Sequence, residues 1–282
     1  MSVPPLRSTS RLRERVRARR GECTTPAASL APRPPDVHLL LAPDSPEAAR
    51  EAVRSGVDAV VLDLYGDDGS GQDLAMAWAC ARTVQIARAG AGRSRSPQLR
   101  LRVNPAGTAA CEDELAQLAG MCEGLILPEV RSADDVQWVA KRAPAVRIVP
   151  VIENAEGLSR AASISSHPAV SRLGYSAAGF TRRARRAGEA GTEAVGLLLS
   201  AEVRQWQRGI MIAAAVAAGL PGPVNGIGTA RAKAGLDAYA EDAAPARSAG
   251  FTGQCANSPA QLARLSRLWG PAAAPPPHRE AG

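Results

Sequence analysis

The sequence predicts an α/β fold, a (β/α)8 TIM barrel preceded by a disordered N-terminal arm. Eight short apolar runs alternate with helical patterns between Val37 and Trp269, and this alternation favours parallel strands that are each followed by a helix. Aromatic residues make up 3% of the chain, so the core is mainly aliphatic, as in a parallel sheet covered by helices. A doubly wound open sheet is the competing fold. It would carry a glycine-rich dinucleotide fingerprint after its first strand, where residues 42–46 read Ala-Pro-Asp-Ser-Pro.

Changes in composition divide the chain into three segments. Residues 1–35 are rich in Pro, Arg, Ser and Ala without a sustained period, which predicts a disordered basic arm. Residues 36–270 form the barrel, and residues 271–282, with three consecutive prolines, form a disordered tail. Eight arginines and two glutamates give residues 1–34 a charge of +6 out of the net +7 of the chain. The barrel is therefore nearly neutral and is not expected to bind nucleic acid. The arm could contact nucleic acid or an acidic partner, although a plain extension is the simpler interpretation.

Helix caps and turn residues define the first half of the barrel. The expected strands are the apolar runs 37–41, 59–64, 98–103 and 124–127. The helices that follow them are 46–55, 72–88, 111–120 and 134–143. Ser45 is the expected N-cap of the first helix, with Pro46 in its first position. A glycine-containing turn precedes the second helix, Pro128 closes the fourth strand, and Ser132 caps the fourth helix.

The second half repeats the same rhythm with longer connections. Its expected strands are 147–152, 170–175, 224–227 and 251–255. Its expected helices are 156–163, 201–218, 236–249 and 259–268. A long loop, which includes residues 181–200, leads from the sixth strand to its helix. Pro245 weakens the prediction of the seventh helix, and Ser258 is the expected cap of the eighth.

Two of the strands end in polar residues suited to chemistry. The third strand runs into Arg102 and Asn104, and the fifth runs into Glu153. The carboxyl ends of barrel strands meet at one rim, where active sites of this fold lie. An arginine there can hold an acidic substrate, and a glutamate can hold a metal ion. A buried glutamate paired with Arg102 is the structural alternative for Glu153. The next strand, within residues 172–179, carries no second carboxylate.

Several short motifs together resemble the HpcH/HpaI aldolase and citrate lyase β-subunit family, in its CitE-like branch of CoA-ester lyases. The similarity extends from about Val37 to Trp269 and rests on the order and spacing of the motifs. The motifs are Leu-Ala-Pro-Asp-Ser-Pro at 41–46, Gly-Val-Asp-Ala-Val-Val-Leu-Asp-Leu at 56–64, Leu-Arg-Val-Asn-Pro at 101–105, Leu-Ile-Leu-Pro at 125–128, Val-Ile-Glu at 151–153, Gly-Phe-Thr-Gly at 250–253 and Ser-Pro-Ala-Gln at 258–261.

The resemblance implies a magnesium-dependent barrel, often a homotrimer, that acts on a CoA ester or a related keto acid. Such enzymes make or break a carbon–carbon bond beside the thioester, through an enolate stabilised by the metal, or they hydrolyse the thioester. By this resemblance Arg102 and Glu153 are the catalytic residues. Arg102, Asn104 and Glu153 bind the substrate, and Glu153 is a magnesium ligand.

Five polar positions at the same rim depart from the family pattern. The acidic pair after the second strand reads Asp63-Leu64-Tyr65-Gly66, and the lysine after the fourth strand is Glu129. The second metal aspartate is Gly179. The aspartate near the seventh strand is Asn225, and the histidine before Pro-Ala-Gln is Ser258. Asp67 and Asp68 follow the second strand and could replace the missing ligand, although loop carboxylates are more often simply solvated.

Two functions follow from this pattern. The first is a CitE-like lyase or thioesterase whose activity is impaired by the lost residues. The second is a non-catalytic barrel that serves as a scaffold for a ligand or a partner protein. The arginine run at 182–186, in the loop after the sixth strand, could hold the phosphates of CoA or could be a solvated loop.

The sequence gives no sign of a membrane or secreted protein. It has no membrane-length apolar run, no apolar signal core and no paired cysteine spacing, which together predict a cytoplasmic protein. The arginine-rich start also resembles an organellar transit segment.

Overall fold

The computed structural model describes residues 36–65, 73–90, 96–186, 200–228 and 235–269, without the side chains of 184–186. Within them, eight parallel strands pair in chain order and β8 pairs with β1, so the barrel is closed. The strands are β1 (Asp36–Leu41), β2 (Ala59–Asp63), β3 (Gln98–Arg102), β4 (Gly124–Leu127), β5 (Arg147–Ile152), β6 (Gly174–Tyr175), β7 (Val224–Asn225) and β8 (Gly253–Ala256). The predicted (β/α)8 TIM barrel is confirmed. The predicted arm and tail lie outside the described residues.

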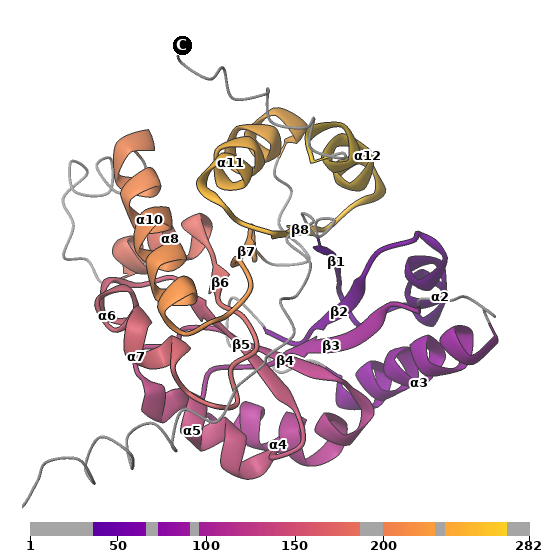
Figure 1. Cartoon of the computed structure of the whole chain (residues 1–282). Coiled ribbons are helices and arrows are strands. Elements are labelled where there is room, and N and C mark those ends of the chain that lie inside the picture. Colours follow the sequence, from indigo (N-terminus) through magenta and orange to yellow (C-terminus); the bar gives the residue numbers. More distant parts are fainter. Residues whose placement is uncertain (1–35, 66–72, 91–95, 187–199, 229–234, 270–282) are drawn as a thin grey trace, which may run out of the picture. The chain divides into compact units, whose positions relative to one another are not determined.

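Helices surround the strands (Figure 1). They are α2 (Pro46–Arg54), α3 (Leu74–Gly90), α4 (Ala109–Leu118), the 3-10 turn η1 (Ala119–Met121), α5 (Ala133–Arg142), α6 (Ala155–Ser159), α7 (Ala161–Ser165), α8 (Ala177–Arg186), α10 (Ala201–Ala217), α11 (Leu236–Ala249) and α12 (Pro259–Leu268). Ser45, Ser132 and Ser258 each accept a backbone N–H in the first turn of the helix that they precede, as predicted. Pro245 lies inside α11 without ending it.

Alternation along the strands divides the core into two apolar layers. Val61 of β2 faces the barrel interior, whereas its neighbours Val60 and Leu62 pack outward against the helices. The interior layer is small and aliphatic apart from one cysteine: Leu40, Val61, Ile126, Val149, Val151, Val224, Ile227 and Cys255. These interior side chains fill the middle of the barrel, so a ligand has room only at one of its two ends.

Charged side chains fill the barrel near the amino end of β1. Arg172 Nη1 lies 2.7 Å from Asp36 Oδ2, and Arg100 Nη1 lies 3.2 Å from His38 Nε2. Burial, reinforced by the nearby Arg100, lowers the pKa of His38 to about 4, so the ring is neutral at pH 7. These contacts occupy the amino end of the barrel, which leaves the carboxyl rim for a ligand, as is usual for this fold.

The sixth and seventh strands are shorter than predicted, the seventh being Val224–Asn225, and one predicted helix is divided. The sixth strand is reduced to Gly174–Tyr175, because residues 170–173 do not form a continuous ladder with the neighbouring strands. They make isolated hydrogen bonds instead: Ser171 N donates to Ile148 O, and Val224 N donates to Leu173 O. The predicted helix 156–163 is two helices, α6 and α7, which meet at Arg160.

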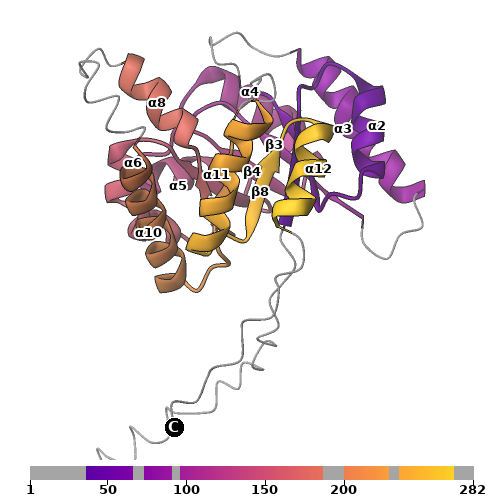
Figure 2. The ribbon, with the colours of Figure 1, turned by 90° about the horizontal axis from the view of Figure 1, so that it is seen from above.

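The largest difference lies after β6, where a long loop was expected. Residues Ala177–Arg186 form the helix α8, which lies above α10 in Figure 2. The helix begins one residue beyond Ser176, whose Oγ accepts the backbone N–H of Gly179 at 3.0 Å. The arginine run is therefore helical rather than part of a loop, which fixes where its first members point.

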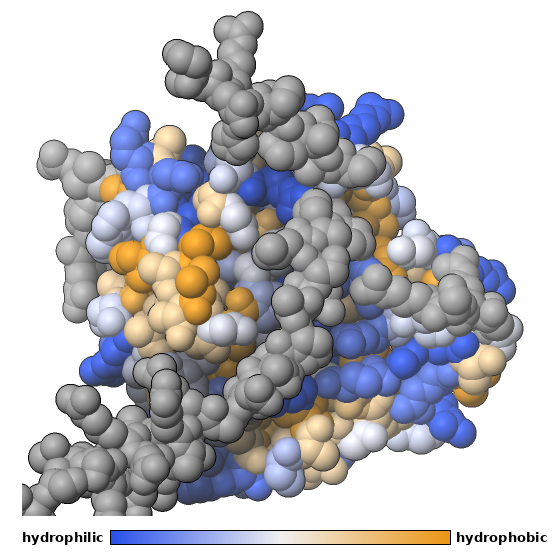
Figure 3. All heavy atoms as spheres, viewed as in Figure 1, coloured by the Kyte–Doolittle hydropathy of each residue, from blue (hydrophilic) through white to orange (hydrophobic). Residues whose placement is uncertain are grey.

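The surface of the described residues carries few large apolar side chains. Trp206 and Val216 of α10 are 63% and 72% exposed, and apolar side chains gather where α10 lies in Figure 3. None of the described helices combines the length and the apolar character that a membrane crossing requires.

Candidate active site at the carboxyl rim

Arg102 is the last residue of β3 and is completely buried at the carboxyl rim. The strand register places it beside Asp63, the last residue of β2. Its Nη1 donates to Asp63 Oδ1 at 3.2 Å and to the Gly228 carbonyl at 2.6 Å. Its guanidinium also lies 4.5 Å from the ring centroid of Tyr65, within the range of a cation–π contact. An ion pair, a carbonyl and an aromatic face thus hold Arg102 in one orientation.

Asn104 is held by Glu114 of α4. Its backbone N–H donates to Glu114 Oε2 at 2.7 Å, and its side-chain amide donates to Glu114 Oε1 and to the Leu64 carbonyl. Burial raises the pKa of Glu114 to about 7, against the lowering effect of the two hydrogen bonds from Asn104. Sequence reasoning missed Glu114, although a signal was present. It occupies a buried position of α4 between Cys111 and Leu118, in an otherwise apolar stripe.

The raised pKa of Glu114 predicts a pH dependence of stability. The unfolded carboxyl titrates near 4.5 and the folded one near 7, so the folded state binds the proton more tightly between these values. The stabilising contribution is therefore complete below pH 4.5 and is lost as the pH rises through 7, by up to about 3 kcal/mol. Urea unfolding between pH 5 and 8 should show this fall in the difference between the unfolding free energies of the wild type and Glu114→Gln, because that difference cancels the opposite pH dependence that the lowered pKa of His38 gives to both proteins. Parallel curves for the two proteins would contradict the prediction.

Glu153 directly follows β5 and is 1% exposed. Its Oε1 accepts the backbone N–H of Glu129 at 2.8 Å, and its Oε2 lies 3.6 Å from Arg182 Nη2 of α8. Glu129 has a positive φ of 59°, a conformation that non-glycine residues adopt at some cost. That conformation aims its N–H at Glu153.

Glu129 connects the Glu153 side of the rim to the Arg102 side. Its Oε1 accepts the hydroxyl of Tyr65 at 2.7 Å, and its Oε2 is paired with Arg183. Because the Tyr65 ring also contacts Arg102, the contacts run without interruption across the rim. The structure thus brings Arg102 and Glu153 to one end of the barrel. Two of their partners, Tyr65 and Glu129, occupy positions that the sequence marked only as departures from the family pattern.

Gly179 packs directly against Glu153. A Cβ built on Gly179 would overlap the carboxylate of Glu153 and lie 2.6 Å from its Cβ. The side chain of Glu153 therefore occupies the space in which an aspartate side chain at position 179 would have to lie. A glycine is therefore required at position 179 for α8 and Glu153 to keep these places.

The described residues do not fit a magnesium ion at Glu153. Magnesium requires near-octahedral oxygen ligands and uses one or two carboxylates together with waters. Glu153 and Glu129 face guanidinium groups instead, and no cluster of three or more His, Cys, Asp or Glu residues occurs in the described part of the chain. The possible substitute ligands Asp67 and Asp68 lie outside it.

The two other departures from the family pattern have structural partners. The Asn225 side-chain amide donates to Asp242 Oδ2 at 2.8 Å and to Gln254 Oε1 at 3.0 Å. Ser258 accepts the backbone N–H of Gln261 as the N-cap of α12. Both side chains therefore serve the packing of helices on the barrel.

A cavity of about 280 Å3 opens at this rim. Gly228, whose carbonyl accepts from Arg102, forms part of its wall, so the guanidinium lies just behind the cavity. The wall is completed by β1, α8, α10, α11, β8 and α12, with residues that include Leu40, Ala177, Arg204, Tyr239 and Cys255. The volume suits a small acyl group or keto acid rather than a whole coenzyme.

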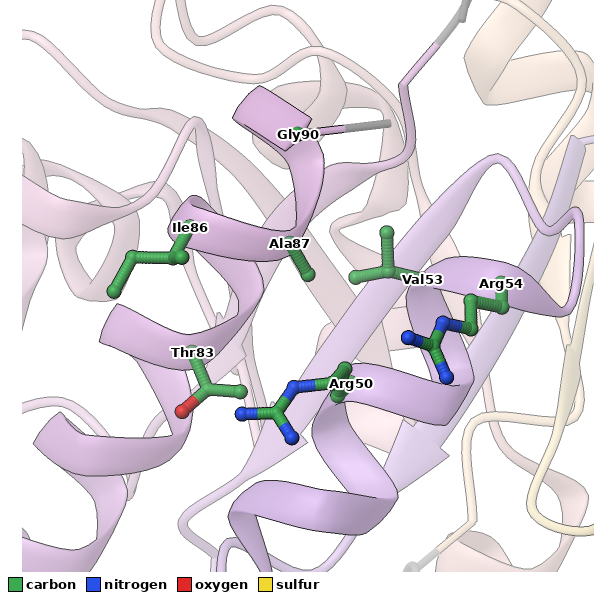
Figure 4. A pocket seen from close by; sticks show the side chains of 7 residues that line it. All are labelled: Arg50, Val53, Arg54, Thr83, Ile86, Ala87 and Gly90. Atoms are coloured by element: carbon green, nitrogen blue, oxygen red, sulfur yellow. The ribbon is translucent and has the colours of Figure 1, made fainter. Parts of the chain in front are cut away.

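A larger cavity of about 440 Å3 lies outside the barrel, between α2 and α3. Figure 4 shows the residues that line it: Arg50, Val53 and Arg54 on α2, and Thr83, Ile86, Ala87 and Gly90 on α3. Arg54 and Gly90 end their helices, at the end opposite to the carboxyl rim. Among the described residues, this lining has two arginines and one threonine but no carboxylate, histidine, cysteine or lysine.

Comparison with known proteins finds similarity in sequence to one curated protein and similarity in fold to solved structures. No family model matches the chain. A (3S)-malyl-CoA thioesterase of Cereibacter sphaeroides is 31% identical over 133 residues, which are 46% of this chain and 45% of that protein. The match therefore spans about half the length of that relative.

Solved structures share the barrel along most of their length. The citrate lyase β subunit of Mycobacterium tuberculosis, complexed with oxaloacetate and magnesium, is 21% identical with a TM-score of 0.62, over 86% of this chain and 99% of that chain. CitE of the same organism, with magnesium, acetoacetate and coenzyme A, is 22% identical with a TM-score of 0.60, over 84% and 80%. RipC of Yersinia pestis is 20% identical with a TM-score of 0.60, over 86% and 98%.

Proposed function

We propose that this chain is a CoA-ester lyase or thioesterase, as the resemblance of its motifs to the HpcH/HpaI aldolase and citrate lyase β-subunit family implies. Its substrate is a CoA ester that carries a carboxylate, or a related keto acid. The relatives support this substrate class, since one is a malyl-CoA thioesterase and others are complexed with oxaloacetate or with acetoacetate and coenzyme A.

The placement of Arg102 is the observation that carries the proposal. Arg102 is fully buried at the carboxyl rim, behind the wall of a cavity, and is oriented by Asp63 and Tyr65. A guanidinium held in this way can bind an anionic substrate. A carboxylate can replace the Gly228 carbonyl as an acceptor and take two N–H bonds from the guanidinium. Asn104 acts by positioning the end of β3, and Glu153 lies across the rim as the partner of α8.

The magnesium-stabilised enolate that the resemblance implies stays a prediction. The described residues do not fit the ion, so no step is assigned to it. The changed polar positions also lead us to expect slower turnover than in an intact lyase. The homotrimer and the cytoplasmic location remain predictions as well; light scattering and cell fractionation test them.

Cleavage of malyl-CoA tests the proposed activity and separates its two forms. A lyase breaks the carbon–carbon bond to give acetyl-CoA and glyoxylate, whereas a thioesterase releases free CoA and malate. Arg102→Lys should lower kcat/KM by at least about tenfold, because a lysine keeps the charge but loses the bidentate fork. Arg50→Lys on α2 is the matched control and should behave as the wild type.

The alternative function, a non-catalytic scaffold, is favoured by one observation. The carboxylates of Glu129 and Glu153 are already paired with arginines of α8. A folded protein that binds acetyl-CoA or oxaloacetate in calorimetry but releases neither glyoxylate nor free CoA would establish the scaffold. If it neither binds nor cleaves these ligands, the proposed substrate class is wrong.

A further inference from the structure

Helix α8 places two guanidinium groups on two carboxylates of the rim. Arg182 Nη2 lies 3.6 Å from Glu153 Oε2, and Arg183 is paired with Glu129 Oε2. Glu153 is 1% exposed, so its charge needs a partner close by. The cation beside Glu153 in this chain is thus an arginine of the chain itself.

The position of Arg182 follows from the way α8 is anchored one turn earlier. Gly179 packs against Glu153 without space for a Cβ. Its neighbour Phe180 is buried and lies 5.9 Å from Tyr175 between ring centroids. Residues three and four positions apart lie on the same face of a helix. Arg182 and Arg183 therefore lie on the face that Gly179 presents to the rim.

Three carboxylates among the described rim residues are each paired with a guanidinium. The carboxylates of Asp63, Glu129 and Glu153 are paired respectively with Arg102, Arg183 and Arg182. A divalent cation would have to displace at least one guanidinium or add two positive charges in a largely buried site. A guanidinium also offers five N–H donors in a planar fork that matches a carboxylate or an enolate oxygen.

We propose that Arg182 takes over at Glu153 the charge-neutralising role that the family resemblance assigns to magnesium, so that the rim binds an anionic substrate without a divalent cation. Arg182 is then a substrate-binding residue of the proposed activity, carried by a helix that the loop prediction did not foresee. The substrate class rests on the proposed function, whereas the absence of a metal requirement can be tested on the protein alone.

The first test measures the binding of Mn2+ to the ligand-free protein. Electron paramagnetic resonance reports the concentration of the free ion. The wild type is expected to leave Mn2+ unbound up to millimolar concentration, because its carboxylates are occupied. A dissociation constant in the micromolar range would overturn the inference and leave the proposed CoA-ester activity standing.

Oxaloacetate binding by calorimetry is the second test. The affinity of the wild type for oxaloacetate should be the same within about twofold in EDTA and in 5 mM Mg2+. In EDTA, Arg182→Gln should weaken it by about tenfold and Arg182→Lys by less, because a lysine keeps the charge. Arg50→Gln, which changes an arginine outside the rim, should match the wild type.

The outcomes separate the two proposals. Binding that appears only with Mg2+, or an unchanged affinity in Arg182→Gln, would refute the inference alone. No binding in either condition would count against both proposals, with the fold checked by circular dichroism. Because the metal comparison uses the wild type, a variant that fails to fold does not decide the result.

Discussion

Replacing Gly179 with aspartate is expected to destabilise the protein by about 3 kcal/mol and not to create a magnesium ligand. Its Cβ would overlap the Glu153 carboxylate, and overpacking of a buried contact costs about 1–3 kcal/mol. The new carboxylate would also stand beside that of Glu153, and like charges this close oppose each other. Urea unfolding measures the loss.

Two further variants separate the causes of that loss. Gly179→Ala adds the overlap without the charge and should lose most of the same stability. Ala178→Asp adds the charge at the exposed neighbouring position of α8 and should stay within about 0.5 kcal/mol of the wild type. If Gly179→Asp instead kept the wild-type stability and bound Mn2+ tightly, α8 would not be held against Glu153 as the structure has it.

Replacing Asp63 with alanine is expected to cost about 3–5 kcal/mol, the second large effect. Asp63 and Arg102 are both buried, and removing one member of a buried ion pair leaves the other charge without its counter-charge. Among its described contacts, the Gly228 carbonyl and the Tyr65 ring stay near the guanidinium, and neither carries a full negative charge. The shift of the urea midpoint measures this effect.

A double variant distinguishes the effect of breaking the ion pair from the effect of losing side-chain volume. Asp63→Leu combined with Arg102→Met removes both charges and should recover most of the stability, because buried pairs replaced by apolar residues are often neutral. Asp113→Ala, an exposed position of α4, is the control and should change little. A double variant as unstable as Asp63→Ala would contradict this account.

Local signals in the sequence were sufficient for most of the barrel. The alternation of apolar runs and helical patterns predicted all eight strands, and the serine caps predicted where three helices begin. The break at Arg160 was not foreseen. It follows a turn in which Gly157 approaches the Val130 carbonyl so closely that a Cβ would overlap it. Such an approach depends on a residue of another βα unit.

The site was predictable only in part. Arg102 and Glu153 stand at strand ends, so the barrel rule places both at one rim. Their partners depend on contacts between distant parts of the chain. The Tyr65 hydroxyl meets Glu129 across 64 positions, and Arg183 meets the same carboxylate across 54. Charge runs such as 182–186 are typical of solvated loops as well as helices, so composition alone could not place α8 on the rim.

The contact between Gly179 and Glu153 determines the order of the changes that would convert this chain into a metalloenzyme. A metal ligand at position 179 and the side chain of Glu153 would compete for one volume, so this exchange alone cannot supply both ligands. The backbone after β6 has to be rerouted first, and Arg182 and Arg183 have to be removed with it. Metal ligands can be added only after that redesign.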